Sequence, residues 1–403
     1  MTFPESIDMA RPAAPFLAGG RRPKLLFLAT EDWYFWSDRL PFARAARAQG
    51  FDVMVAARVA AHGERIRGEG FALRPLRWRR RGDGPGGAAR ALRDIVRIYR
   101  RERPDIVHHL ALKPILFGGL ARRLAFPRER ERPLRVDAVM GLGSGFSAAD
   151  PAAPLRRLLL RLALRLSARD PKGCLVVQNP DDGAALAGFG IASERIALIR
   201  GSGIDVARFR PLPEPEEDGV TVAFVSRMLR EKGVLDAVAA IRRLRAAGMA
   251  ITLLLAGMPD PGNKGSLAVA ELRALAREPG ILWLGAVADV RTVWRRSAIA
   301  VLPSTYGEGL PRALLEAAAC ARPIVATDIP GCREVVRSGE TGILVPPRDV
   351  AALAAALAAL AGDRARRRAM GEAGRRLIED RFAEEIVIGE TLALYHKLLG
   401  QWR

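Results

Sequence analysis

Two successive series of short apolar segments, separated by helix-like stretches, constrain the fold of this chain. The first series runs from KLLFLAT to CLVVQNP (24–30, 51–57, 103–110, 135–141 and 174–180). The second runs from VTVAFVS to PIVATD (220–226, 251–257, 281–285, 299–304 and 323–328). Buried parallel strands have such continuous apolar runs, and crossover helices occupy the segments between them. The pattern therefore predicts an α/β fold with two Rossmann-like, doubly wound domains.

The predicted boundaries follow from composition along the chain. Residues 1–22 contain acids and prolines but no basic segment followed by an apolar one, so we expect a flexible N-terminal tail rather than a signal peptide. The first domain is predicted at 23–207, and the prolines and acids of 208–219 predict a linker. The second domain is predicted at 220–380. The amphipathic segment 381–403 is expected to be a helix that either stays on the second domain or crosses back to the first.

Charge is distributed unevenly between the two halves. Residues 1–200 hold 36 Lys+Arg against 20 Asp+Glu, which accounts for +16 of the net charge of +20. A basic half could face nucleic acid, an anionic membrane or a phosphorylated substrate, or it could reflect an arginine-rich genome. Three scattered cysteines give neither a disulfide framework nor a zinc spacing, and the apolar run 350–362 is shorter than the ~20 residues of a membrane span. These features favour the cytoplasm.

The segment TYGEGLPRALLEAAAC places two glutamates around the predicted start of a helix. Glu308 lies in a glycine-flanked loop after a predicted buried strand, and Glu316 lies inside the helical run. Pro311 suits the first helical position, and Gly309 allows the backbone to approach a ligand closely. The two carboxylates could flank one extended ligand that carries hydroxyls at both ends and phosphates between them. The alternative is a capped surface helix whose second glutamate faces solvent.

A second cluster follows the first strand of the second domain, in SRMLREKGV. Arg227 and Lys232 bracket a loop at the carboxyl edge of the predicted sheet, where open α/β sheets bind ligands. Two cations there would neutralise a diphosphate, arginine as a bidentate fork and lysine as a point charge. A solvated loop with two exposed cations is the simpler alternative.

Taken together, the two clusters make the second half resemble the donor-binding half of family-4 retaining glycosyltransferases, which have the GT-B fold. The similarity includes LLLAGMPDPGN and TGILVPPRD and departs at Ala321, where the family usually has glycine and where we expect only a narrower turn. The resemblance implies that Arg227 and Lys232 bind the donor diphosphate and stabilise its departure. It implies that Glu308, with Gly309 and Leu310, contacts the sugar, and that Glu316 contacts the ribose. No metal or other cofactor is expected.

The first half resembles the branch of that family that extends lipid-linked saccharides for capsule, lipopolysaccharide or glycan precursors. Asp38-Arg39-Leu40 replaces the His-Arg-Leu that is frequent there. Candidate acceptor or phosphate contacts are, in chain order, His108, His109, Lys113, Gly141 and Gly143. Histidines in a sheet core and glycines that only shape a turn are the simpler alternatives.

Two basic stretches of the first half indicate membrane contact. RPLRWRRR (74–81) clusters five arginines around Trp78, as expected of an interfacial anchor. Residues 155–170 predict an amphipathic helix, with an arginine stripe at positions 157, 161, 165 and 169 and leucines largely opposite (155, 158, 159, 162 and 166). A helix packed on the domain core explains the second pattern equally well.

The resemblance implies an enzyme with two domains facing each other across a cleft. We expect a retaining transferase that moves a hexose or N-acetylhexosamine from a nucleotide-diphosphate sugar, with UDP as the expected nucleotide, to a polyprenyl-linked saccharide. It would act at the inner face of the cytoplasmic membrane. Another GT-B enzyme, a phosphorylase or a sugar-nucleotide epimerase, is the first alternative. A nucleic-acid-binding protein is the second, although no recognition motif accompanies the basic charge.

Overall fold

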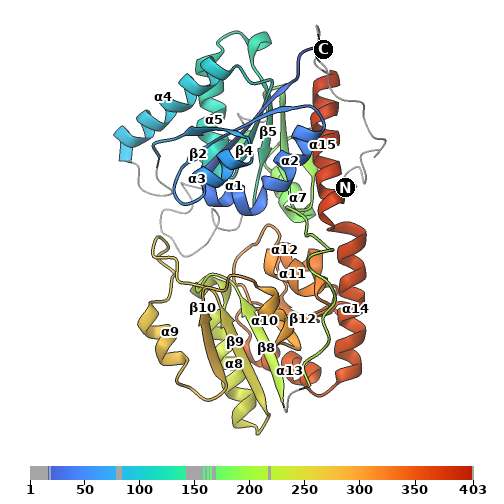
Figure 1. The fold of residues 1–403 in the computed structure, drawn as a ribbon. Helices are drawn as coiled ribbons and strands as arrows, with labels where there is room; N and C mark the ends of the chain where they lie inside the picture. Colours follow the sequence, from blue (N-terminus) through green and yellow to red (C-terminus); the bar gives the residue numbers. More distant parts are fainter. Residues whose placement is uncertain are drawn as a thin grey trace. The chain divides into compact units, whose positions relative to one another are not determined.

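The structure is a computed structural model that describes residues 17, 20–78, 84–141, 158, 161, 162, 164, 165, 169–216 and 219–401. The chain divides into two compact units, drawn as ribbons in Figure 1. Unit 1 comprises Met1–Ser202 and Glu385–Arg403, and unit 2 comprises Gly203–Glu384. Unit 2 thus begins shortly before the predicted linker, and nearly all of the predicted tail lies outside the described residues.

Unit 1 contains a sheet of seven parallel strands in the order β3-β2-β1-β4-β5-β6-β7. Alternate residues of a central strand pack on opposite faces: Phe27 and its neighbours two positions away belong to one core cluster, whereas Leu26 and Leu28 belong to another. Both faces are therefore apolar and must be covered. The strands are β1 Lys24–Glu31, β2 Asp52–Arg58, β3 Ala72–Pro75, β4 Ile106–Leu110, β5 Leu134–Ala138, β6 Gly173–Val177 and β7 Ile196–Leu198.

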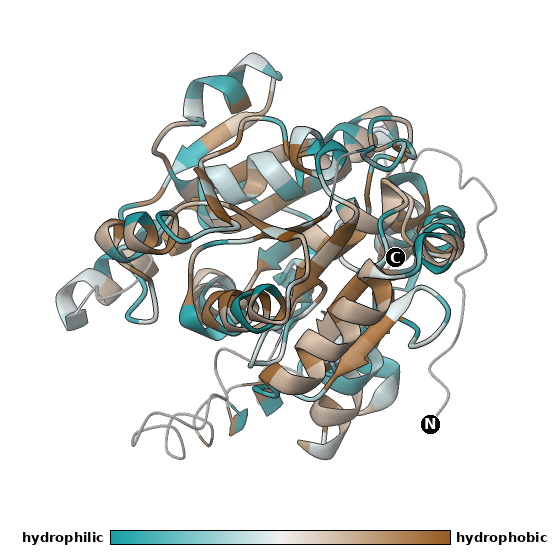
Figure 2. Cartoon of the chain, turned by 90° about the horizontal axis from the view of Figure 1, so that it is seen from below, coloured by the Kyte–Doolittle hydropathy of each residue, from teal (hydrophilic) through white to brown (hydrophobic). Residues whose placement is uncertain are grey.

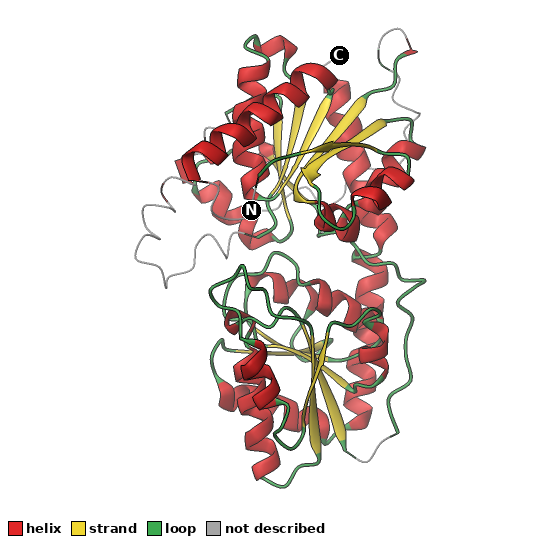
Figure 3. Ribbon diagram, turned by 60° about the vertical axis from the view of Figure 1, so that its left-hand side comes forward, coloured by secondary structure: helices red, strands yellow, loops and turns green. Residues whose placement is uncertain are grey.

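Helices cover both faces of this sheet, as Figure 3 shows in red around the yellow strands. They are α1 Asp32–Asp38, α2 Leu40–Ala48, α3 Gly63–Gly68, α4 Gly84–Glu102, α5 Leu112–Ala125, α7 Pro180–Gly188 and α15 Glu384–Gln401, with 3₁₀ turns η2 Glu129–Glu131 and η4 Ser193–Arg195. Most strands carry the hydrophobic colour in Figure 2, while the helices alternate between hydrophilic and hydrophobic segments. This contrast is what a sheet buried on both faces requires.

Unit 2 contains six parallel strands in the order β10-β9-β8-β11-β12-β13, again between helices. Its strands are β8 Val220–Val225, β9 Ile251–Ala256, β10 Ile281–Gly285, β11 Ile299–Leu302, β12 Ile324–Thr327 and β13 Gly342–Val345. Its helices are α8 Val234–Ala246, α9 Val269–Leu275, α10 Arg291–Arg295, α11 Arg312–Ala319, α12 Pro330–Val335, α13 Val350–Ala361 and α14 Arg364–Arg381, with the 3₁₀ turn η5 Arg230–Lys232. Two such sheets confirm the predicted pair of doubly wound domains and the GT-B fold.

Three strands have no counterpart among the predicted segments: β3, β7 and β13. Each lies at an edge of its sheet and pairs with a single neighbouring strand. An edge strand is covered less completely than a central one, so its sequence need not be a long apolar run. The four residues of β3, for example, include an arginine and a proline. The sequence prediction therefore missed these three strands because they lie at the edges of the sheets.

The C-terminal helix α15 belongs to unit 1, so the chain returns to its first domain after completing the second. Figure 1 shows this helix in red beside the sheet of unit 1. Val387, Leu394 and Leu398 join the core cluster that also contains Phe27 and Ile106. The Tyr395 hydroxyl lies 2.5 Å from His108 Nδ1 in β4. Among the described residues, no helix has both the length and the apolarity needed to cross a bilayer.

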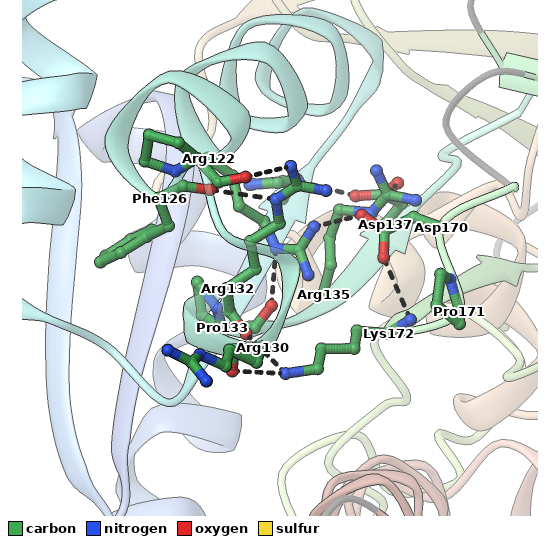
Figure 4. A network of polar contacts seen from close by, with 12 residues as sticks. Arg122, Phe126, Arg130, Arg132, Pro133, Arg135, Asp137, Asp170, Pro171 and Lys172 are labelled. Atoms are coloured by element: carbon green, nitrogen blue, oxygen red, sulfur yellow. Dashed lines mark hydrogen bonds and ion pairs between the residues drawn. The ribbon is translucent and has the colours of Figure 1, made fainter.

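A network of buried charges joins α5, β5 and the segment before β6 in unit 1 (Figure 4). The Asp137 carboxylate forms a hydrogen bond with His109 Nδ1 of β4 at 2.7 Å. Its other oxygen lies 3.0 Å from Arg135 Nε. Arg122 donates to the Pro133 carbonyl at 2.6 Å and pairs with Asp170, and both side chains are almost completely buried. Burial acts to raise the pKa of Asp170, but the neighbouring Arg122 outweighs this and holds that pKa below its ordinary value.

Ala321 occupies a backbone position that usually favours glycine. Its φ is +57°, in the left-handed region that costs a residue with a Cβ roughly 1–2 kcal/mol. Its carbonyl packs against α14, where a Cβ on Gly371 would lie only 2.1 Å from the Ala321 oxygen. Alanine in place of the family glycine therefore strains the turn, whereas the sequence had led us to expect only a narrower turn.

We predict that Asp170→Ala lowers the free energy of unfolding by about 3–5 kcal/mol, because it leaves the Arg122 guanidinium buried without its counterion. Urea unfolding followed by circular dichroism measures the change. Arg21→Ala is the matched control, since it removes an arginine that is half exposed and pairs with Asp105 at the surface. It should cost less than about 1 kcal/mol. Equal effects of the two substitutions would contradict the structural role given to the buried pair.

Candidate functional site

The sheet of unit 2 reverses its strand order between β8 and β11. From β8 the chain proceeds outward through β9 and β10, and from β11 it proceeds in the other direction through β12 and β13. The loops that follow β8 and β11 therefore diverge at neighbouring strand ends. In open α/β sheets, such a switch point creates a crevice at the carboxyl ends, where ligands bind. Both glutamates and both cations singled out in the sequence lie on these two loops or on the helix that follows one of them.

The two loops are tied together by their backbones. Gly233 ends the turn η5 with φ of +78°, and a Cβ there would lie 1.9 Å from the Pro303 carbonyl oxygen. Only glycine permits so close an approach. The Glu231 carbonyl accepts hydrogen bonds from the Thr305 amide at 2.8 Å and from Ser304 Oγ at 3.2 Å. Lys232, between Glu231 and Gly233, is thereby held against the loop that carries Glu308.

Lys232 and Glu308 form a buried ion pair at the centre of this site. Lys232 Nζ lies 2.5 Å from Glu308 Oε1, and the two side chains are only 12% and 10% exposed. Ser304 Oγ donates to the same carboxylate oxygen at 2.8 Å, and Tyr306 places its ring 5.4 Å from the ammonium. Burial acts to lower the pKa of Lys232, but Glu308 and Tyr306 outweigh it, so that pKa is raised and the ammonium stays charged.

Arg227 lies on the same loop and pairs with a carboxylate from the loop after β9. Its Nη1 donates to Asp260 Oδ2 at 2.6 Å, while 44% of the arginine side chain remains exposed. Asp260 is oriented in turn by the Ser266 hydroxyl, which accepts from its amide at 2.8 Å. A guanidinium held by one nitrogen at a strand end is prepared to meet an anion with its remaining donors.

Glu316 lies in α11, eight positions after Glu308, and is only 8% exposed. Arg312 Nε donates to it at 3.0 Å. This burial contradicts the alternative in which Glu316 faces solvent. The helix begins at Arg312 with Pro311 as its N-cap, one residue later than predicted. Gly309 is buried and Leu310 is half-buried beside them.

The backbone of Glu308 is fixed from behind by α12. A Cβ on Gly331 would lie 2.7 Å from the Glu308 carbonyl oxygen and 2.5 Å from that of Gly309. The helix therefore packs directly on the loop, with no side chain between them. Sequence reasoning missed this support and also missed Ser304, Tyr306 and Asp260. The first two flank the glutamate motif, so their position beside Glu308 was the available signal.

The predicted acceptor or phosphate contacts in unit 1 differ in their surroundings, and His108 is the first of them. His108 is 3% exposed, and its Nε2 has no hydrogen-bond partner among the described residues. The residue lines a cavity of about 10 Å³, room for one water molecule. Arg39 lines the same cavity, and its buried Nε also lacks a hydrogen-bond partner within the described part of the chain. Burial, followed by the charge of Arg39, lowers the pKa of His108 well below its ordinary value. A neutral His108 facing a water-sized space has no room for a sugar ring.

The remaining unit 1 predictions have mixed outcomes. His109 is fully buried between Asp137 and the Tyr99 hydroxyl, 2.8 Å from its Nε2, so it belongs to the core and the predicted ligand contact is wrong. Lys113 is half-buried in α5, with its ammonium 5.1 Å from the Trp78 ring. Gly141 has φ of +99°, consistent with a tight turn. Gly143 lies outside the described residues.

The predicted interfacial anchor at Trp78 is also wrong. The indole is 2% exposed, and its Nε1 donates to the Thr30 carbonyl at 2.9 Å. Trp78 packs with Leu26, Leu28 and Ile95 in the core. The arginines around it suggested an interface because a sequence pattern does not distinguish a tryptophan that faces outward from one that closes a core. Residues 79–83 lie outside the described residues.

The two doubly wound units have the GT-B fold, which is a fold of glycosyltransferases. Comparison with protein families agrees: residues 24–168 match the model described as "Glycosyl transferase 4-like", and residues 219–363 match "Glycosyl transferases group 1". The chain belongs to the family-4 glycosyltransferases and is an enzyme of that class. Among the described residues, no group of three or more His, Cys, Asp or Glu side chains is arranged to hold a metal ion.

Known proteins cover nearly the whole chain. The putative glycosyltransferase EpsD of Bacillus subtilis is 27% identical over 92% of this chain and 96% of its own. The capsular polysaccharide biosynthesis glycosyltransferase CapM of Staphylococcus aureus is 22% identical over 77% of this chain and 82% of its own. Among solved structures, HepE of Anabaena in complex with UDP aligns with a TM-score of 0.72 and 18% identity, covering 93% of this chain and 99% of that one.

We predict that Gly331→Ala destabilises the protein by about 1–3 kcal/mol, because the new methyl group must displace the backbone at Glu308 and Gly309. The midpoint of thermal unfolding reports the change. Gly374→Ala is the matched control: its Cβ would meet no atom closer than 3.5 Å, and the position lies inside α14. Alanine should be neutral or stabilising there. Tolerance of Gly331→Ala without loss of stability would contradict the packing described.

Proposed function

We propose that this enzyme transfers a hexose or N-acetylhexosamine from a UDP-sugar to a lipid-linked saccharide, with retained configuration, in polysaccharide biosynthesis. The observation that carries the proposal is the grouping of Arg227, Lys232, Glu308 and Glu316 around one switch point, within unit 2. Two cations and two carboxylates match a ligand with a diphosphate between two hydroxyl-bearing rings. The UDP bound to HepE and the capsular polysaccharide biosynthesis in the name of CapM support the same assignment.

Each side chain then has a separate role. Arg227 and Lys232 bind the diphosphate and take up the charge that develops as it leaves, so the protein's own cations serve where other enzymes use a metal ion. Glu308, together with the backbone of Gly309 and Leu310, accepts hydrogen bonds from the sugar hydroxyls. Glu316 accepts hydrogen bonds from the ribose. Neither carboxylate needs to change its protonation state in these roles.

The Lys232–Glu308 pair suggests how the site remains stable without a donor. Each buried charge neutralises the other, which avoids the cost of an isolated charge. A bound donor would offer phosphate oxygens to the ammonium and hydroxyls to the carboxylate. The Lys232 ammonium would then contact phosphate and the Glu308 carboxylate would contact sugar hydroxyls, and the two side chains would stay next to each other. Arg227 is more exposed. It can bind a phosphate with its other nitrogens while its Nη1 keeps the hydrogen bond to Asp260.

In the proposed reaction, the bond between the anomeric carbon and the diphosphate oxygen breaks, and a bond from the acceptor hydroxyl oxygen to the same carbon forms. Departure and attack take place on the same face of the sugar, which retains configuration. The acceptor proton passes to the departing diphosphate oxygen, so charge and atoms balance. We place the acceptor on unit 1, whose sequence carries most of the positive charge, at the inner face of the cytoplasmic membrane.

The donor assignment predicts that the two ends of the ligand can be tested separately. Arg227→Ala should weaken UDP binding by roughly tenfold to a hundredfold and UMP binding much less, because UMP lacks the second phosphate. Glu316→Gln should weaken UDP and UMP by similar factors, because both contain the ribose. Isothermal titration calorimetry measures both ligands with both variants.

Arg230→Ala is the control for that experiment. Arg230 lies on the same loop but pairs with Glu271 at the surface, 2.5 Å away and half exposed. Its removal should leave both affinities near those of the wild type. If Arg227→Ala and Arg230→Ala weaken UDP equally, the effect is general charge attraction and the diphosphate role of Arg227 is wrong.

The sugar role of Glu308 predicts a loss of catalysis with a folded protein. Glu308→Gln keeps the shape of the side chain, so the Ser304 hydrogen bond can persist, but it removes the charge and the stronger acceptor. We expect sugar transfer from the UDP-sugar to fall by roughly 10²–10³-fold. UDP should still bind, and Glu278→Gln at the surface should retain full activity. Wild-type turnover by Glu308→Gln would remove this residue from the site.

A further inference from the structure

Helix α5 carries an unusual second apolar stripe that faces outward. Leu116, Leu120 and Leu124 recur every four residues and are 38%, 49% and 47% exposed. The opposite side of the same helix is already packed in the core through Ile115 and Ala121. Residues spaced by four lie along one side of a helix, so the three leucines form a continuous exposed row. None of the three belongs to a core cluster of the described part of unit 1.

The neighbouring helix α4, which packs along α5, surrounds this row with positive charge. Its exposed residues include five arginines (Arg90, Arg93, Arg97, Arg100 and Arg101). Arg100 donates to the Leu124 carbonyl at 3.0 Å, which ties the two helices together. We call the five arginines and the three leucines the leucine–arginine surface.

The acidic residues of α4 offset only part of this positive charge. Asp94 and Glu102, the acids of the helix, are both about nine-tenths buried. Arg77 pairs with Asp94 at 2.8 Å and Arg74 pairs with Glu102 at 2.7 Å, both from the chain before the helix. Arg97 and Arg101 lie 3.8 Å and 3.6 Å from the same two carboxylates, so two acids face four arginines. The charges of the two acids are largely neutralised there, and α5 contributes no acid. The leucine–arginine surface therefore keeps a net positive charge.

The described residues between 158 and 165 also combine exposed leucines with exposed arginines. Leu158 and Leu162 are 60% and 51% exposed, although the sequence alternative of an ordinary packed helix would bury them. Leu164 is fully buried in the core cluster that contains Ile115, so this segment lies beside α5. Arg161 and Arg165 are exposed next to these leucines. Of the described residues in this segment, the leucines on the predicted packing face thus point to solvent.

We propose that the leucine–arginine surface docks on an anionic lipid bilayer, a proposal that rests on the lipid-linked acceptor proposed above and specifies how the enzyme reaches it. Leucines beside arginines fit the boundary between acyl chains and headgroups: the leucines enter the apolar layer, and the long arginine stems reach outward to lipid phosphates. A row of exposed leucines beside a net positive charge complements a negative surface. A protein partner or a second copy would have to supply that negative charge itself.

The test is co-sedimentation with vesicles of phosphatidylcholine alone or with about 30% phosphatidylglycerol, at about 0.1 M salt. Wild type should bind the anionic vesicles more tightly. Leu120→Gln with Leu124→Gln should weaken binding to them by roughly tenfold or more. Arg90→Ala, Arg93→Ala and Arg97→Ala together should weaken it by roughly a hundredfold and remove most of the preference for anionic lipid.

Matched controls come from unit 2. Leu282→Gln removes a leucine of similar exposure (44%), and Arg295→Ala with Arg296→Ala removes two exposed arginines. These variants should bind vesicles as the wild type does. Circular dichroism, measured on every variant, shows that each is folded. UDP affinity, which reports on unit 2, distinguishes failure of this proposal from failure of the donor assignment.

Three results would overturn the proposal. The first is a wild-type protein that ignores anionic vesicles. The second is a leucine double variant that binds them as tightly as the wild type. The third is a wild-type dimer in light scattering that the leucine variant dissociates, because the surface would then be an interface between copies of this chain.

Discussion

The direction of the parallel strands determines where chemistry can occur in this enzyme. Because every strand of unit 2 runs the same way, all the loops that leave the carboxyl ends lie at one edge of the sheet. The order of the strands reverses between β8 and β11, so two of these loops diverge from adjacent positions. Short backbone contacts, through Gly233 and the Glu231 carbonyl, then hold the divergent loops together. Lys232 and Glu308, 76 residues apart in sequence, become neighbours as a consequence.

Burial separates ion pairs that maintain the fold from ion pairs that a ligand can enter. Arg122 and Asp170 are almost completely enclosed, so no ligand can replace either partner, and the pair stabilises unit 1 only as long as both are present. Arg227 pairs just as closely with Asp260, yet nearly half of its side chain faces solvent. Lys232 and Glu308 are intermediate, sheltered but at the edge of the sheet. The same chemistry of opposite charges thus has a structural role in one unit and a proposed catalytic role in the other.

The excess of arginine in the first half likewise divides between two roles. Arg122 and Arg135 are buried in the core, while Arg74 and Arg77 neutralise acids beneath the surface of α4. The arginines that remain exposed on α4 surround the leucines of α5. The membrane contact inferred from the sequence at Trp78 is therefore replaced by a proposed contact at a different surface. Composition indicated that unit 1 is basic, and packing decided which of its charges can meet a partner.

The sequence by itself determined the two-domain α/β fold, because repeated short apolar runs such as VTVAFVS and ITLLLAG, separated by helix-like segments, are typical of strands covered on both faces. It also determined the residue types at the candidate donor site, since Arg227, Lys232, Glu308 and Glu316 belong to compact local motifs. Only the tertiary structure decided that α15 returns to unit 1, that His109 serves the core, and that Trp78 is buried while Leu120 is exposed. Local patterns report which residues are apolar or charged. Whether a given side chain meets protein or solvent depends on segments far away in sequence, which come together only when the chain folds.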